Sequence, residues 1–161
     1  MTLIIRTEDQ PNNGLRDRSI EVPPNDLGSE RVLRLVHDLA ETMRKENGCG
    51  IAAPQVGIHE RIIIVDSDNG PRAYVNPEIV SRSFRTRVSE EGCLSVPGVW
   101  GMVKRNRSVR VDAFDEEGQK VSVEADGLQS VIFQHEIDHL DGILFTDRVE
   151  KFSKPPKHTA L

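Results

Sequence analysis

The first part of the chain repeats apolar residues with the period of an α-helix. Ser29 is a suitable N-cap, and Asn47 with Gly48 is a suitable C-terminal stop. Between them the apolar positions recur every three or four residues, at Val32, Leu35, Val36, Leu39, Ala40 and Met43. This spacing predicts an amphipathic helix with one buried face.

A second helical repeat lies near the end of the chain. Asp126 is a candidate N-cap, Gln129 is its capping-box partner, and Gly142 follows the last apolar position. The helix face is formed by Leu128, Val131, Ile132 and His135. We expect this face, which carries His135, to turn inward.

The segments between the two helices have the alternation and the short apolar runs of β-strands. The runs are residues 62–65, 73–75, 79–88, 109–114 and 121–123, with turn signals at 68–71, 76–77 and 115–118. Residues 6–28 are rich in Pro, Asn and Gly and are predicted to be mostly loop. Together these elements predict an α+β fold, in which antiparallel sheets pack around the second helix and one helix precedes them.

Length and composition suit one globular domain spanning residues 1–161, with residues 153–161 as a disordered tail. The chain is 37% hydrophobic and 29% charged, and it carries a net charge of −5. No apolar run is long enough to cross a bilayer, and the acidic balance argues against DNA as a partner. The first 13 residues do not resemble a secretory signal, so we expect a cytoplasmic protein. In that compartment two cysteines do not form a disulfide framework.

The second predicted helix contains the pattern His-Glu-x-x-His, formed by His135, Glu136 and His139. Residues four apart share one helix face with Cβ atoms about 5–6 Å apart, so both imidazoles can bind one divalent metal. The Glu136 carboxylate would lie beside that metal, where it can take a proton from an attacking water. Two packed core histidines are the alternative, which this spacing around a glutamate disfavours.

A catalytic metal site of this kind usually has three protein ligands and one open position. The longer motif that ends in a third histidine is excluded, because Phe145 stands at that position. Glu150 is a carboxylate downstream of the motif, but the 11 residues after it are too few for a supporting helical domain. We therefore expect the third ligand upstream.

Two upstream stretches suit a site. Residues 48–55, Gly-Cys-Gly-Ile-Ala-Ala-Pro-Gln, are small enough for another backbone to come close. They end at Gln55, which offers an amide donor, although a tight connection with a solvated Gln55 is the alternative. Residues 91–98, Glu-Gly-Cys-Leu-Ser-Val-Pro-Gly, contain Cys93, and its spacing alone fits a thiolate ligand and a buried inert thiol equally well.

Taken with residues 134–139, Gln-His-Glu-Ile-Asp-His, these stretches resemble the three motifs of the peptide deformylase family, in the family's order and at compatible separations. The resemblance covers the chain from the first helix to Phe145. It implies an enzyme that removes the formyl group from the N-terminal formylmethionine of new polypeptides and releases formate.

The resemblance implies a role for each matching residue. The metal ligands are Cys93, His135 and His139, the general base is Glu136, and the formyl oxygen is held by Gln55 and the backbone N–H of Leu94. This ligand set implies one divalent metal per chain, Fe²⁺ natively, with Zn²⁺, Ni²⁺ or Co²⁺ as substitutes. Glu91 and Arg105 match a pair that fixes the Cys93 loop, and Asp138 is expected to orient a ligand from behind.

The resemblance also implies how a peptide binds. The substrate backbone adds as a strand along Cys49, Gly50 and Gly92. Its methionine side chain enters an apolar pocket formed by Cys49, Leu128, Val131, Ile132 and the ring of His135. The chain departs from common family members at Ser89 and Trp100, which we expect at the pocket rim, so the preference beyond methionine stays open.

Nascent formylmethionyl polypeptides are the implied partners, and the chain is expected to be a monomer. Bacterial family members often continue into a C-terminal helix that contacts the ribosome, which Lys154-Pro155-Pro156-Lys157 forbids here. Basic residues of this region, Lys151, Lys154 and Lys157, leave weak ribosome contact as the expectation.

Two other functions use the same residues. A zinc peptidase would share the helix, but its third ligand would not be a cysteine. A closed structural site of Cys49, Cys93, His135 and His139 would have no use for Glu136 or Gln55.

Overall fold

The computed structural model describes residues 1–154 as two helices and eight strands. The helices are α1 (Glu30–Lys45) and α2 (Gly127–Leu140). The strands are β1 (Gly50–Ala52), β2 (Ile62–Val65), β3 (Arg72–Arg82), β4 (Thr86–Cys93), β5 (Val96–Asn106), β6 (Ser108–Phe114), β7 (Lys120–Asp126) and β8 (Val149–Ser153). The predicted α+β class is confirmed.

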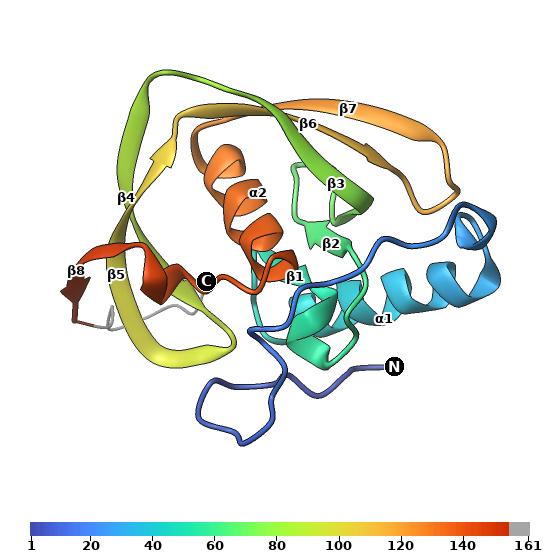
Figure 1. Ribbon diagram of the computed structural model, residues 1–161, viewed down its shortest axis with the longest axis horizontal. Helices are drawn as coiled ribbons and strands as arrows, with labels where there is room; N and C mark the ends of the chain where they lie inside the picture. The colour runs from blue at the N-terminus through green and yellow to red at the C-terminus, as the bar shows by residue number, and fades with distance from the viewer. Residues whose placement is uncertain (155–161) are drawn as a thin grey trace.

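Both sheets are antiparallel, and α2 lies between them (Figure 1). The larger sheet has the strand order β1-β2-β3-β6-β7, and the smaller has β4-β5-β8. Strands β3 and β4 lead the chain from the first sheet to the second, and β5 and β6 bring it back. Because β1 and β4 are edge strands of different sheets, each has one side on which no strand of the described chain is paired.

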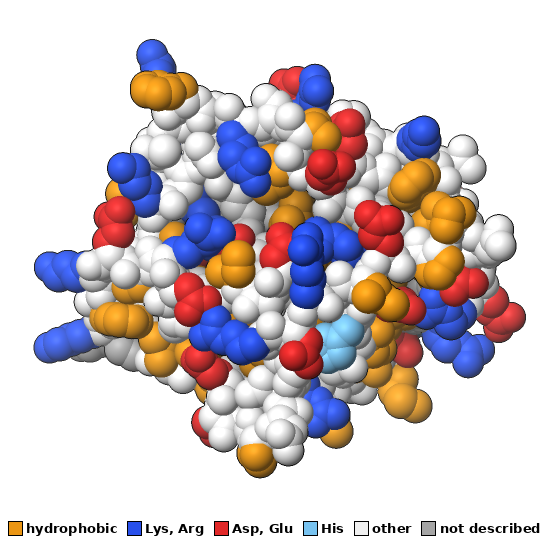
Figure 2. Space-filling model, in the orientation of Figure 1, with side chains coloured by type: hydrophobic (Ala, Val, Ile, Leu, Met, Phe, Trp, Pro, Cys, Tyr) orange, Lys and Arg blue, Asp and Glu red, His pale blue; other side chains and the backbone are white. Residues whose placement is uncertain are grey.

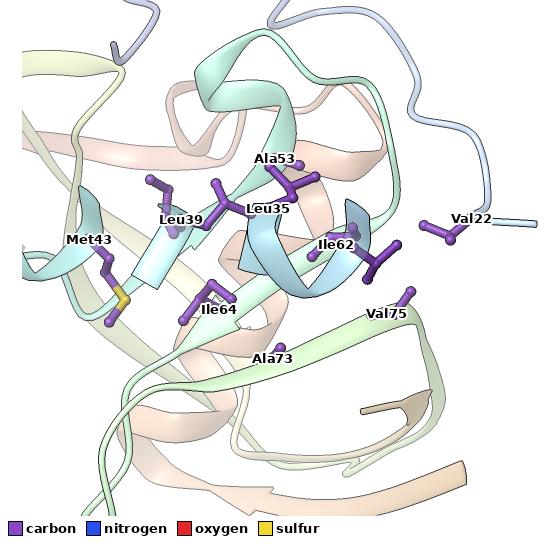
Figure 3. Packing of buried hydrophobic residues seen from close by; sticks show 11 residues of the cluster. Val22, Leu35, Leu39, Met43, Ala53, Ile62, Ile64, Ala73 and Val75 are labelled. Carbon is purple, nitrogen blue, oxygen red and sulfur yellow. The ribbon is translucent and has the colours of Figure 1, made fainter. Parts of the chain in front are cut away.

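Strand β2 explains why one apolar run has no polar positions. Ile62 and Ile64 pack against α1 in one core cluster, whereas Ile63 and Val65 belong to the cluster that contains α2. Figure 3 shows the first cluster, in which Leu35 and Leu39 of α1 cover Ile62 and Ile64. A strand buried on both faces needs apolar residues at every position.

Helix α1 agrees with its prediction. Ser29 is the N-cap, and its hydroxyl accepts a hydrogen bond from the backbone N–H of Val32 at 3.3 Å. At the other end Asn47 takes the left-handed conformation, with φ of 55°, and Gly48 N–H bonds the carbonyl of Met43 at 2.9 Å. These bonds satisfy backbone groups that the helix end leaves free.

The N-cap residue of α2 was predicted correctly, but the predicted side-chain capping bonds are absent. Asp126 occupies the N-cap position, but its side chain makes no capping bond. Gln129 does not form a capping box, because its amide donates to the carbonyl of Asp66. The predicted C-terminal glycine is present: Gly142 has φ of 73°, and the following Ile143 N–H bonds the carbonyl of Asp138 at 2.9 Å.

The inward-facing side predicted for α2 needs correction. Its last three turns are buried on most sides, because strands of both sheets contact the helix. Leu128, predicted to face inward, is 57% exposed, whereas Gln134 and Asp138 on other faces are buried. Polar residues inside this helix therefore need hydrogen-bond partners from the sheets.

Some strand limits differ from the prediction. Asn76 and Pro77 are not a turn; they form a bulge within β3, where Asn76 has φ of 51°. The predicted strand at residues 79–88 is divided between β3 and β4 by residues 83–85. Strands β1, β5 and β8 were not predicted.

The two ends of the chain frame the fold. Residues 6–28 are mostly loop, as predicted, and they bury Leu15 and Val22. The predicted disordered tail begins at Ser153, yet Ser153 is the last residue of β8 and pairs with Trp100. The rest of that prediction, residues 155–161, lies outside the described residues. Within residues 1–154, neither helix has the length and apolarity that a bilayer span requires.

Candidate active site

Three metal-binding side chains converge where β4 ends beside α2. His135 and His139 lie one helix turn apart, with ring centroids separated by 5.0 Å. The Cys93 Sγ atom lies 3.2 Å from Nε2 of His139. One ligand atom from each of the three residues lies within 4.8 Å of the other two. The fold thus supplies the upstream third ligand that the sequence required, and a Cys-His-His set suits a soft or intermediate divalent metal.

The environment of His139 favours the neutral imidazole that a metal needs. Burial lowers the pKa of His139 well below its usual range, and its Nδ1 atom has no hydrogen-bond partner among residues 1–154. A neutral ring keeps a lone pair available for a ligand bond.

Glu136 is buried beside these ligands. Glu136 is 5% exposed, and its Oε2 atom has no hydrogen-bond partner within the described chain. Burial raises the pKa of Glu136 to about 7. A positive charge held by the neighbouring ligands would oppose that shift, since it favours the carboxylate. A carboxyl group poised in this range can both accept and donate a proton.

Gly50 permits the approach of Glu136. A Cβ atom placed on Gly50 would lie 2.5 Å from Glu136 Oε1 and 2.9 Å from its Cγ and Cδ atoms. The small residues at 48–55 were predicted to admit another backbone, but at Gly50 the close neighbour is the Glu136 side chain. Any larger residue at position 50 would displace the Glu136 side chain.

Gln55 is a fixed donor in the site, and the alternative of a solvated side chain is excluded by its 2% exposure. It lies in a 3-10 turn at Ala53–Val56. The side-chain oxygen accepts from Ala52 N–H at 2.8 Å, which turns the amide nitrogen towards Ser95 Oγ at 3.2 Å and Cys93 Sγ at 3.6 Å. Ser95 was not predicted as a site residue, and its place two residues after Cys93 was the available signal.

Glu91 and Arg105 form a buried ion pair behind the site. Both side chains are at most 3% exposed, and two hydrogen bonds of 2.9 and 3.0 Å join them. Glu91 also accepts from Nδ1 of His135 at 2.8 Å, which leaves Nε2 of that ring free for a metal. Burial raises the pKa of Glu91, but the bonds from His135 and Arg105 prevail and lower it to about 2.

The Asp138 side chain does not contact a metal ligand directly, contrary to the prediction, but is separated from the ligands by Arg105 and Glu91. Its carboxylate bonds Arg105, and it also bonds Arg148 through Nε at 2.6 Å and Nη2 at 2.8 Å. It touches neither ligand histidine through a hydrogen bond, so any orienting effect passes through Arg105 and Glu91. Arg148 was missed by the sequence reasoning, because no motif includes it.

A pocket opens beside the ligands. Its lining includes every residue expected to receive the methionine side chain: Cys49, Leu128, Val131, Ile132 and His135. Gly50, Gly92, Gln55 and Leu94 line it as well. Burial raises the pKa of the Cys49 thiol, so this residue stays neutral and adds to the apolar wall. Leu128 is exposed and lies in the first turn of α2, where the pocket meets solvent.

The expected pocket rim was wrong in its residues. Neither Ser89 nor Trp100 lines the pocket, whereas Glu90 does. Trp100 pairs with Gly92 across β4 and β5, and a Cβ atom on Gly92 would lie 3.0 Å from the indole ring. Trp100 therefore packs against Gly92, which lines the pocket.

Comparisons with known proteins agree with this geometry. The family model described as polypeptide deformylase matches residues 4–155. A peptide deformylase of Acetivibrio thermocellus is 50% identical over 127 residues, covering 79% of this chain and 74% of that protein. One from Neisseria gonorrhoeae is 43% identical, covering 84% of this chain and 88% of that protein.

Solved structures give the same result. A class I type b peptide deformylase from Acinetobacter baumannii, bound to Met-Ala-Ser, has a TM-score of 0.86 at 36% identity, covering 92% of this chain and 99% of that one. A peptide deformylase from Thermotoga maritima has a TM-score of 0.87 at 37% identity, covering 93% and 99%.

Proposed function

This chain belongs to the polypeptide deformylase family, and from that premise we propose how its own residues carry out the reaction. The protein is a peptide deformylase, an enzyme that removes the N-formyl group from nascent peptides. The observation that carries the proposal is the buried Glu136 beside the converging Cys93, His135 and His139, at the end of an apolar pocket.

Cys93, His135 and His139 hold the divalent metal. The donor set supports Fe²⁺ as the native ion, with Zn²⁺, Ni²⁺ and Co²⁺ as substitutes, since one thiolate and two imidazoles suit all four. When bound, the metal polarises the formyl carbonyl and lowers the pKa of water. Glu91 holds the ring of His135 in the orientation that presents Nε2, and Arg105 holds Glu91 in place.

Glu136 acts as the general base and then as the general acid. It takes a proton from the attacking water and passes it to the amine that leaves when the C–N bond breaks. Burial favours both transfers, because it raises the pKa of this carboxyl towards the working pH, where a proton carrier is most efficient.

Gln55 and Leu94 stabilise the negative charge that develops on the formyl oxygen. The amide nitrogen of Gln55 is already held towards the ligand side of the pocket by Ala52, so little reorganisation accompanies the reaction. The second donor is the backbone N–H of Leu94, the residue that follows Cys93. Each such donor typically contributes about 10²–10³-fold to turnover.

The peptide binds as an added strand between β1 and β4. Both are edge strands within the described chain, and Cys49 and Gly50 on one side face Gly92 on the other across the pocket. Main-chain pairing tolerates many sequences, while the pocket selects methionine. The relative from Acinetobacter baumannii was solved with Met-Ala-Ser bound, which supports a peptide product in the same place.

The wider setting follows from the substrate. We expect a cytoplasmic monomer that meets nascent polypeptides and touches the ribosome weakly through Lys151 and Lys154. Lys157 belongs to the same prediction and lies outside the described residues.

The test is formate release from formyl-Met-Ala-Ser by anaerobically purified protein whose metal content is measured in the same sample. Unformylated Met-Ala-Ser is the matched control. We expect formate from the first peptide and no cleavage of the second, with about one metal ion per chain. Cleavage of Met-Ala-Ser at a comparable rate would assign a peptidase instead.

A further inference from the structure

A basic corner joins the two sheets on the side away from Cys93. We define it as residues 80–88, which lead from β3 into β4, together with residues 104–110, which lead from β5 into β6. Thr86 lies opposite Asn106 and Ser81 opposite Arg110, and Arg107 N–H bonds the carbonyl of Arg85 at 2.9 Å. The corner is therefore a hydrogen-bonded ribbon with a defined shape.

The charge of the basic corner is opposite to that of the chain. Its two segments hold seven of the 21 Lys and Arg residues and none of the 26 Asp and Glu residues. Arg105 is buried, and the other six are exposed: Arg82, Arg85, Arg87, Lys104, Arg107 and Arg110. Lys and Arg side chains project at the upper left of Figure 2, over the β3–β4 corner of Figure 1. Such a local excess on an acidic protein is suited to a polyanion.

The exposed cations of the basic corner are mostly free of acidic partners. Elsewhere Arg16, Arg31 and Arg61 pair with carboxylates at 3.1 Å or less. Among the six exposed cations of the corner, Arg107 alone has such a neighbour within residues 1–154, Asp126 at 3.5 Å. Arg110 lies opposite Glu124 in the sheet without an ion pair. Free guanidinium groups can bind an external anion without first breaking an internal bond.

An aromatic ring stands among these cations. Phe84, at the turn between β3 and β4, is 102% exposed, so it has no packing partner. Its neighbours Val80 and Val88 are 39% and 48% exposed. A single fully exposed phenyl ring among arginines gives a nucleobase a face to stack on.

A polar groove runs beside this ring across β3, β6 and β7. It is lined by Arg82 and Arg110, by the hydroxyl residues Ser81, Ser83 and Ser108, and by Val109, Ala125, Glu124 and Asp126. Hydroxyl and guanidinium groups at this spacing hydrogen-bond phosphate and ribose oxygens. The two carboxylates lie along the β7 side of the groove, which directs a polyanion towards β3 and Phe84.

We propose that the basic corner binds RNA through an unpaired segment, with phosphates along Arg82, Arg85 and Arg110 and one base stacked on Phe84. Five of the six exposed cations are arginines. A planar guanidinium group can donate two hydrogen bonds to one phosphate and can stack on a base. A lipid surface is flat and does not match the groove, and a stretch of acidic residues such as polyglutamate has no ring to stack on Phe84.

The location gives this surface a consequence for catalysis, which rests on the proposed function. The corner is bonded to the start of α2: Gly127 N–H donates to the carbonyl of Arg107, and Ser130 Oγ to that of Asn106, both at 3.0 Å. The same helix turns carry Leu128 and Val131 of the pocket. RNA at the corner would hold the pocket near peptides that emerge beside RNA.

The test measures the binding of a fluorescently labelled, mixed-sequence 12-nucleotide RNA by anisotropy at several salt concentrations. One variant combines Arg82→Gln, Arg85→Gln and Arg110→Gln, and another is Phe84→Ala. The matched control combines Arg34→Gln, Arg44→Gln and Lys45→Gln, three exposed residues of α1, so the net charge changes equally. Formate release from formyl-Met-Ala-Ser reports that each variant is folded, and it is expected to be unchanged.

The outcomes separate the alternatives. We expect the corner variant to bind at least tenfold more weakly and its salt slope to fall by about 2, which corresponds to three lost phosphate contacts on a single strand. Phe84→Ala should weaken binding about tenfold without changing the slope. Equal losses in the α1 control, no effect of Phe84→Ala, or equal corner-dependent binding of phosphatidylserine vesicles or polyglutamate would overturn the proposal.

Discussion

The close contact between Gly50 and Glu136 predicts that adding one methyl group at position 50 will lower catalysis strongly. In Gly50→Ala the new Cβ atom would lie 2.5 Å from Glu136 Oε1 and 2.9 Å from Cδ and Cγ. Real Cβ atoms do not approach so closely, so one side must move. The Glu136 backbone is held between two metal ligands in a buried helix, and its carboxylate is therefore the group that shifts.

The size of the effect follows from that displacement. A shift of about 1 Å in a reacting group can lower turnover about 100-fold. A crowded contact in a packed site also costs about 1–3 kcal/mol of stability. We expect kcat for formyl-Met-Ala-Ser to fall about 100-fold while the metal content is unchanged, because the three atoms nearest the new methyl group all belong to Glu136, which is not a ligand.

Gly48→Ala is the matched control from the same loop. Its Cβ atom would lie 3.1 Å from the end of the flexible Leu94 side chain, which can give way, and 3.3 Å from the Gly50 carbonyl oxygen, a tight contact but a longer one than those at Gly50. This variant should keep kcat within about threefold, since small surface adjustments cost little.

A double-mutant cycle tests the cause. If Gly50→Ala acts by displacing the Glu136 carboxylate, it should add little to the loss already caused by Glu136→Gln. If it acts by blocking the peptide strand, KM rises and the two losses add. A Gly50→Ala enzyme with near-normal kcat and an unchanged melting temperature would refute the reasoning.

The remaining predictions concern the metal, its base and the end of the chain. Glu136→Gln should keep its metal and lose nearly all formate release, and loss of the metal would count against its role as a base. Cys93→Ser should weaken metal binding, since a thiolate is lost; an unchanged absorption spectrum of the Co²⁺-substituted protein would argue against Cys93 as a ligand. The Fe²⁺ enzyme should lose activity in air and regain it with Ni²⁺, whereas stable aerobic activity would indicate zinc. Deletion of residues 155–161 should leave turnover on formyl-Met-Ala-Ser unchanged, but deletion from Val149 should lower the melting temperature, because it removes β8 and the packing of Val149 on Gly101.

Local patterns predicted the elements whose environment is simple. Helix α1 has one buried face and a serine cap, and both features are visible in its sequence. Strand β2 is buried on both faces and is a continuous apolar run. In such cases period and composition follow directly from burial.

The elements that the sequence did not predict are those in which contacts with other parts of the fold override the local sequence preference. Strand β5 contains Pro97 and two glycines, which locally favour a turn, yet β4 and β8 pair with it on either side. Pro77 suggested a turn but lies in a bulge of β3, where its missing N–H breaks no regular ladder bond. Helix α2 lacks a clean stripe because sheets cover it on two sides.

The ligand motifs were recognisable in the sequence, but their supporting contacts were not. Glu91 and His135 are 44 residues apart and meet at 2.8 Å only because β4 and α2 cross in the fold. Arg148 reaches Asp138 from the segment after α2, and no local pattern indicates that contact. The residues on α2 that the resemblance implied for the pocket line it in the structure, because a helix fixes their spacing, whereas the walls from β4 depend on how β4 and β5 pair.

The charges around the ligands explain why this site is suited to a divalent cation. Behind the ligands, the carboxylates of Glu91 and Asp138 are balanced by the guanidinium groups of Arg105 and Arg148, so this set contributes no net charge. In front of it, Cys93 and Glu136 can each carry one negative charge. The raised pKa of Glu136 shows that burial opposes this charge more strongly than the neighbouring His135 and Arg105 favour it. A divalent cation held by Cys93, His135 and His139 would balance the charges of Cys93 and Glu136, so the burial that raises the pKa of Glu136 also strengthens the attraction of the site for its metal.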